Sequence, residues 1–95
     1  MRIIGHIDHK RLKITIFKLD NKFAVKFESG PYEQTFKYRI GEIIHQIGDL
    51  KNMIDEEFIL EVEKRLEAMH HSNTKAMDRF LPRRKMQLDE FDEII

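Results

Sequence analysis

The chain has 95 residues, of which 41% are hydrophobic and 36% charged, and its 17 basic side chains balance 17 acidic ones. This length suffices for one small domain with one hydrophobic core, and it excludes a two-domain enzyme with a cleft between its halves. The lack of cysteine excludes disulfides, thiolate catalysis and cysteine zinc sites. No apolar run in the sequence is long enough for a secretion signal or a membrane span, so we expect a cytoplasmic protein without membrane contact.

The net charge of the chain is zero, but its two halves carry opposite net charges. Residues 1–40 contain nine Lys and Arg against four Asp and Glu, whereas residues 41–95 contain eight against thirteen. The spacing of apolar residues changes at the same place, from alternation to a helical period. We therefore predict an α+β fold in one domain, residues 1–81, in which a β-meander (1–40) precedes a helical part (41–81), with residues 82–95 as a flexible tail.

The alternation in the first half predicts a four-stranded antiparallel meander, with strands near residues 2–8, 11–19, 22–28 and 32–39. Three connections put the apolar residues on one face of this sheet: a two-residue turn at 9–10, a second at 20–21, and a four-residue connection at 28–31. In the resulting register Ile3 faces Ile16, and Phe27 faces Tyr32.

The opposite face, which we call the outer face, is predicted to have an apolar centre and a basic rim. Its candidate binding residues are Arg2, Ile4, Lys13, Phe17, Lys37 and Arg39. Such a surface is typical of a docking site for another molecule. Single-stranded nucleic acid is an alternative ligand, but stacking platforms use more aromatic residues than the single Phe17.

The second half predicts a short helix near residues 41–51 and a long helix over 55–81, both packed on one face of the sheet. Asp55 is the expected N-cap of the long helix, Glu56 and Glu57 favour its first turn, and Pro82 is expected to end it.

The long helix is longer than the sheet beneath it. Residues 55–81 extend about 40 Å as a helix, whereas a strand of eight residues extends about 26 Å. The helix must therefore break near residues 71–73 or project beyond the sheet with Met77, Phe80 and Leu81 uncovered. We expect these three residues to form a homodimer interface; alternatively, the tail folds back and covers them with Met86, Leu88 and Phe91.

The sequence contains no strong catalytic or metal-binding motif. The histidines His6, His9, His70 and His71 offer at most a weak metal site, because they lack the i, i+4 spacing of a zinc helix. The two serines lack a glycine-flanked elbow, and the four glycines form no phosphate-binding loop. We therefore expect no enzyme activity, no cofactor and no metal, but a protein–protein interaction module with an unidentified protein partner. The acidic end, residues 88–95 (LDEFDEII), is a further candidate ligand for the basic sheet.

Overall fold

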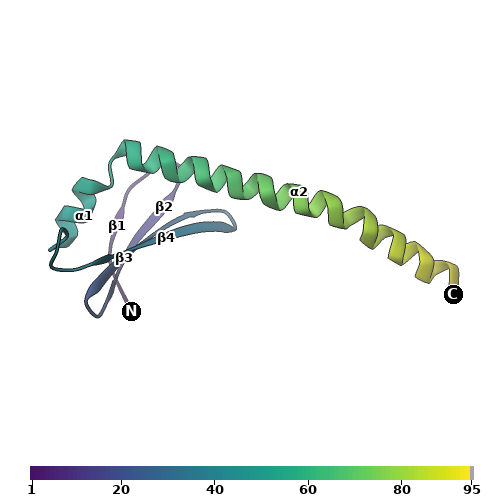
Figure 1. Ribbon diagram of the computed structural model, residues 1–95, viewed down its shortest axis with the longest axis horizontal. Coiled ribbons are helices and arrows are strands. Elements are labelled where there is room, and N and C mark those ends of the chain that lie inside the picture. The colour runs from purple at the N-terminus through teal and green to yellow at the C-terminus, as the bar shows by residue number, and fades with distance from the viewer. Residues whose placement is uncertain (95) are drawn as a thin grey trace.

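The computed structural model describes residues 1–94, and it places side chains for residues 1–83 (Figure 1). One antiparallel sheet with strand order β1-β2-β3-β4 is followed by a short helix and a long helix, which confirms the predicted fold class. The elements are β1 (Arg2–Ile7), β2 (Lys13–Leu19), β3 (Lys22–Ser29), β4 (Tyr32–Arg39), α1 (Ile47–Met53) and α2 (Glu56–Ile94).

The central hairpin has the predicted register, whereas the two outer hairpins are shifted. Ile16 pairs with Val25 across β2 and β3, and Asp20 in the turn has the positive φ of 35° that a tight hairpin requires. In the β3–β4 hairpin Phe27 pairs with Gln34 instead of Tyr32, because Ser29 and Tyr32 still pair and leave a two-residue turn. A shift of two residues keeps every side chain on its predicted face.

A β-bulge in β1 overturns the prediction for the first strand. The connection between β1 and β2 is longer than two residues, and the pairing shifts between Ile3 and Gly5 so that Ile3 faces Phe17 instead of Ile16. One extra residue in a strand exchanges its two faces beyond that point. Ile3 therefore lies on the outer face, whereas Ile4, predicted to lie there, packs against the core. Arg2 pairs with Lys18, whose neighbour across β3 is the buried Phe23, and so it also leaves the outer face.

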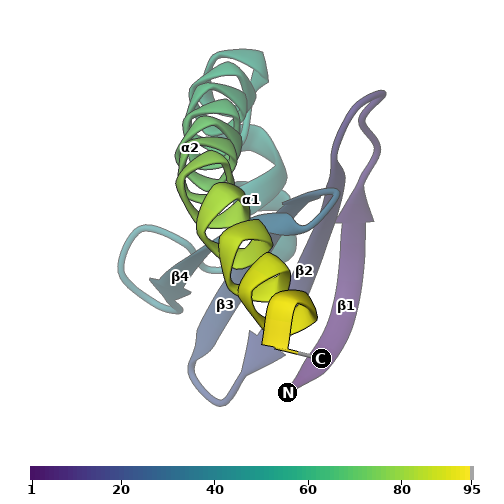
Figure 2. The same ribbon diagram turned by 90° about the vertical axis from the view of Figure 1, so that its right-hand side faces the viewer.

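The first turns of α2 lie over one face of the sheet (Figure 2), and the hydrophobic core lies between this inner face and the helices. Its buried members are Leu12, Ile14, Ile16, Phe23, Val25, Phe27, Ile44, Leu50, Ile54, Ile59, Val62 and Leu66. Gly5 allows α1 to approach β1 closely, because a Cβ atom at this position would lie 2.7 Å from Cδ1 of Ile47.

Side-chain caps determine where both helices begin. α1 begins at Ile47 and not near residue 41, because the Asp49 carboxylate accepts hydrogen bonds from the backbone N–H groups of His45 and Gln46 (2.9 and 3.2 Å). These bonds lower the pKa of Asp49. Asp55 caps α2 as predicted, since its Oδ1 accepts the N–H of Phe58 at 2.9 Å.

α2 continues through Pro82 to Ile94, so the prediction that Pro82 ends the helix is wrong. Proline removes one backbone donor and leaves the carbonyl of Asp78 without its helical partner. Residues 78–83 are exposed, and water can therefore hydrate this carbonyl. The helix neither breaks near residues 71–73 nor turns back on itself, and it gives the molecule a length of 64 Å (Figure 1). The predicted covering side chains of the tail, Met86, Leu88 and Phe91, lie outside those that the structure places.

Candidate interaction surfaces

The first turns of α2 belong to the core, whereas the rest of the helix projects beyond the sheet (Figure 1). Ile59, Val62 and Leu66 are buried, with at most 5% of each residue exposed. Every residue from 67 to 83 is exposed, and we call α2 from residue 67 to Ile94 the projecting segment. Its first turns, as far as Asn73, still touch the sheet through Tyr32. It contains four large apolar side chains that are between 38% and 54% exposed: Met69, Met77, Phe80 and Leu81. Among the side chains that the structure places, none covers the three residues that were predicted as the interface, which are all about half exposed.

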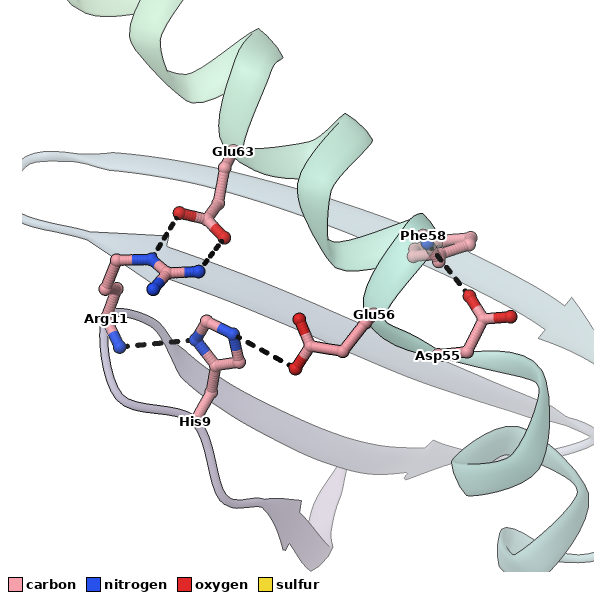
Figure 3. Close-up of polar contacts among 6 residues, drawn as sticks. All are labelled: His9, Arg11, Asp55, Glu56, Phe58 and Glu63. Carbon is pink, nitrogen blue, oxygen red and sulfur yellow. Dashed lines mark hydrogen bonds and ion pairs between the residues drawn. The ribbon is translucent and has the colours of Figure 1, made fainter.

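Polar contacts fix the direction in which α2 leaves the sheet (Figure 3). The guanidinium of Arg11, in the connection before β2, donates two hydrogen bonds to the Glu63 carboxylate, at 2.7 and 2.9 Å. This contact lowers the pKa of Glu63 and raises that of Arg11. On β4, the Gln34 amide donates to the backbone carbonyl of Val62 at 3.0 Å. Because the helix is held from both sides, the projecting segment has a defined orientation relative to the sheet.

Tyr32, at the start of β4, marks the end of the contact between sheet and helix. Its Oη accepts a hydrogen bond from Nδ2 of Asn73 at 3.0 Å and lies 3.1 Å from Nδ1 of His70. Beside it, a groove of about 480 Å³ separates α2 from the tips of the hairpins, lined by Arg11, Leu12, Ser29, Gly30, Tyr32 and Leu66 among others. Asn73, which interrupts the apolar stripe of α2 in the sequence, is therefore a docking residue for the sheet.

The outer face contains four of the six residues that the sequence predicted there. Lys13, Phe17, Lys37 and Arg39 lie on it according to the strand register. Ile3, which is 56% exposed, replaces Ile4 in a cross-strand row with Phe17, Ala24 and Lys37. The sequence did contain a signal for this exchange of Ile3 and Ile4, because a glycine inside a strand, here Gly5, often marks a bulge.

The outer face carries more cations than acids. The register places five cations on it (Lys13, Lys22, Lys26, Lys37 and Arg39) and two acids (Glu28 and Glu33). Lys26 is already engaged, since its Nζ lies 3.5 Å from Glu28, 3.9 Å from Glu33 and 5.3 Å from the centre of the Phe17 ring. Its ammonium group therefore covers the aromatic ring on which a base would stack.

Two of the histidines, His9 and His70, make side-chain contacts within the domain. His9 accepts the N–H of Arg11 at 3.2 Å through Nδ1, and its Nε2 lies 3.8 Å from Glu56 (Figure 3). Nδ1 of His70 lies 3.1 Å from Oη of Tyr32. Within the described part of the chain, no group of three His, Cys, Asp or Glu side chains could hold a metal ion.

None of the helices over residues 1–94 is long and apolar enough to cross a membrane.

Comparison with protein-family models, curated proteins and solved structures found no match to this chain. The contacts and exposed surfaces described above are therefore the basis for a functional proposal.

Proposed function

We propose that this protein is a non-catalytic interaction module that forms a homodimer through the projecting segment of α2. One observation supports this proposal above all: the apolar stripe that buries Val62 and Leu66 against the sheet continues through Met77 and Phe80 with no covering element among the described residues. Apolar side chains that recur at a helical period are typical of a surface that another helix covers.

The energy of burial favours association, but only modestly. Full burial of a Met, Phe or Leu side chain stabilises by about 1.5–3 kcal/mol, so covering the exposed half of Met77, Phe80 and Leu81 is worth roughly 1 kcal/mol each. Two copies gain roughly 6 kcal/mol in this way, against an association cost of about 4–15 kcal/mol. Further apolar contacts are therefore needed for a stable dimer, and the sequence continues beyond Leu81 with Leu88 and Phe91. We expect weak association, with a dissociation constant in the micromolar range or above.

The outer face is the less favoured candidate, as a site for single-stranded nucleic acid. Its cations and the exposed Ile3 support such a role. Two contacts count against it: Lys26 lies over the Phe17 ring and is paired with glutamates, and Phe17 is the sole aromatic residue that the strand register places on this face. On the apolar stripe of α2, the polar contact seen among the described residues is a weak one, from Nδ2 of Asn73 to Sδ of Met77 at 3.6 Å, and Met77 is still 49% exposed.

Substitution of one residue on each side of α2 tests the dimer interface. Leu60 is 50% exposed, like Phe80, but it lies two residues from the buried Val62 and hence on the opposite side of the helix. Sedimentation equilibrium should give a dimer mass for the wild type and for Leu60→Asp, and the 11.5 kDa of one chain for Phe80→Asp. A dimer mass for Phe80→Asp, with unchanged helix content by circular dichroism, would show that the interface lies elsewhere.

A further inference from the structure

We infer that the two copies pair antiparallel, with the α2 helices crossing near residue 84 and the two sheets at opposite ends of the dimer. This inference rests on the proposed dimer and adds its geometry. Three separate features lead to the same arrangement: the position of the sheet, the charge along α2, and the spacing of its apolar residues.

The position of the sheet blocks a parallel pair. Val62, Leu66 and Phe80 lie on one side of α2, since 18 residues make five full turns and bring residue 80 directly above residue 62. The sheet occupies this side as far as Asn73, where Tyr32 binds. Packed helices lie about 8–10 Å apart. In a parallel pair that used this side, both sheets would have to fill the same space between the two helices, whereas in an antiparallel pair they lie far apart.

The charge along α2 favours the same orientation. Residues 74–83 contain the cations Lys75, Arg79 and Arg83 and the acid Asp78, a net charge of +2. Residues 85–94 contain one cation (Lys85) and four acids (Asp89, Glu90, Asp92 and Glu93), a net charge of −3. A parallel pair in register places like charges together, but an antiparallel pair sets each basic half beside the acidic half of the second copy. Complementary charge of this kind selects the orientation of a complex.

The spacing of the apolar residues fixes the register. Met77, Phe80, Leu88 and Phe91 are symmetric about residue 84, at seven and four positions before it and four and seven after it. An antiparallel pair centred there brings residue 77 opposite residue 91 of the second copy, and residue 80 opposite residue 88. Residue 94 then lies opposite residue 74, just beyond Asn73, where the contact with the sheet ends. The overlap therefore uses the projecting helix up to the sheet and no farther.

The groove beside Tyr32 lies at the end of this overlap. Its lining combines the apolar and aromatic side chains of Leu66 and Tyr32 with the charged side chains of Arg11, Glu63 and Glu67, and Arg11 is already paired with Glu63. In the proposed register the C-terminal end of α2 from the second copy approaches this groove. The apolar part of the lining, and not a free cation, is therefore what the groove offers to the second copy.

Distances between spin labels distinguish the two orientations, and the lack of native cysteine allows a single label in each chain. In the proposed register two labels at position 72 are separated by 24 helix positions, about 36 Å at 1.5 Å per residue. Two labels at position 85 are separated by only two positions along the axis. In a parallel pair both distances are short, set by the helix separation of about 8–10 Å and the reach of the labels.

We expect Ser72→Cys to give a distance of about 36 Å or more by pulsed electron resonance, and Lys85→Cys a short one. Short distances at both positions would overturn the antiparallel geometry and leave the dimer standing. The absence of any distance between labels at position 85, together with a monomer mass, would instead refute the dimer itself. Sedimentation of each labelled protein shows whether the label has disturbed association.

Discussion

The same substitution at two leucines of α2 should have very different effects on stability. Leu66 is 5% exposed and packs in the core, whereas Leu81 is 53% exposed on the projecting segment. Both lie on one helix and lose the same atoms on substitution by alanine, so helix propensity and chemistry are matched. The difference between them measures how much of α2 belongs to the folded domain.

The expected magnitudes follow from burial. Leu66→Ala removes buried methyl groups and leaves a cavity, which costs about 2–5 kcal/mol. Leu81→Ala changes a half-exposed surface position, and in the monomer it should alter the free energy of unfolding by less than about 0.5 kcal/mol. For a domain of this size, 1 kcal/mol shifts the melting temperature by about 4–8 °C. Leu66→Ala should therefore melt at least about 8 °C lower than the wild type.

Urea denaturation at two protein concentrations measures both effects. At a concentration low enough to give monomers, only Leu66→Ala should be destabilised. At high concentration Leu81→Ala should also be less stable than the wild type, because it weakens a dimer that stabilises the folded state by mass action. Equal destabilisation by Leu81→Ala at both concentrations would mean that residue 81 is covered by its own chain, and it would contradict cover by a second copy.

Two further predictions concern contacts within the domain. Gly5→Ala should destabilise the fold by about 1 kcal/mol, because the new Cβ would lie 2.7 Å from Cδ1 of Ile47. Ile47→Val removes that atom, so in a double-mutant cycle it should cancel most of the cost of Gly5→Ala. If the losses of the two single variants simply added, the close contact would be contradicted. Arg11→Met should remove a contribution to stability that depends on pH. Arg11 lowers the pKa of Glu63 below its ordinary value of 4.5. The ion pair therefore stabilises the fold above that pH, and its effect is lost as pH falls through the lowered pKa. Urea titrations from neutral to acidic pH should show the two proteins converging at the acidic end, and a constant difference would show that the ion pair is not its source.

The sequence predicted the parts of this fold that depend on the alternation of apolar residues. Alternation together with the predicted turn at residues 20–21 placed Ile16 opposite Val25, and an error of two residues in the β3–β4 turn left every side chain on its correct face. The bulge beside Gly5 was missed because one extra residue leaves the number of apolar positions unchanged while it exchanges Ile3 with Ile4. The alternation of side chains between the two faces can be read from odd and even positions only where no bulge interrupts the strand pairing.

The end of α2 was missed for a different reason. Proline usually ends a helix, but the turn before Pro82 is exposed and the carbonyl that it leaves unpaired can bind water. Met77, Phe80 and Leu81 are nonetheless about half exposed, as expected if α2 outruns the sheet, because this expectation depended on the short reach of the strands and not on where the helix ends. The role of Asn73 could not be predicted, since it depends on the distance between Tyr32 and α2 in the folded chain.

The mass of the unmodified chain across a range of concentrations tests the central claim most directly. If the projecting segment of α2 joins two copies, sedimentation equilibrium should show the average mass rising from 11.5 kDa toward twice that value as concentration increases through the micromolar range. A mass that stays at 11.5 kDa up to the highest soluble concentration would contradict the proposal that a second copy covers Met77 and Phe80.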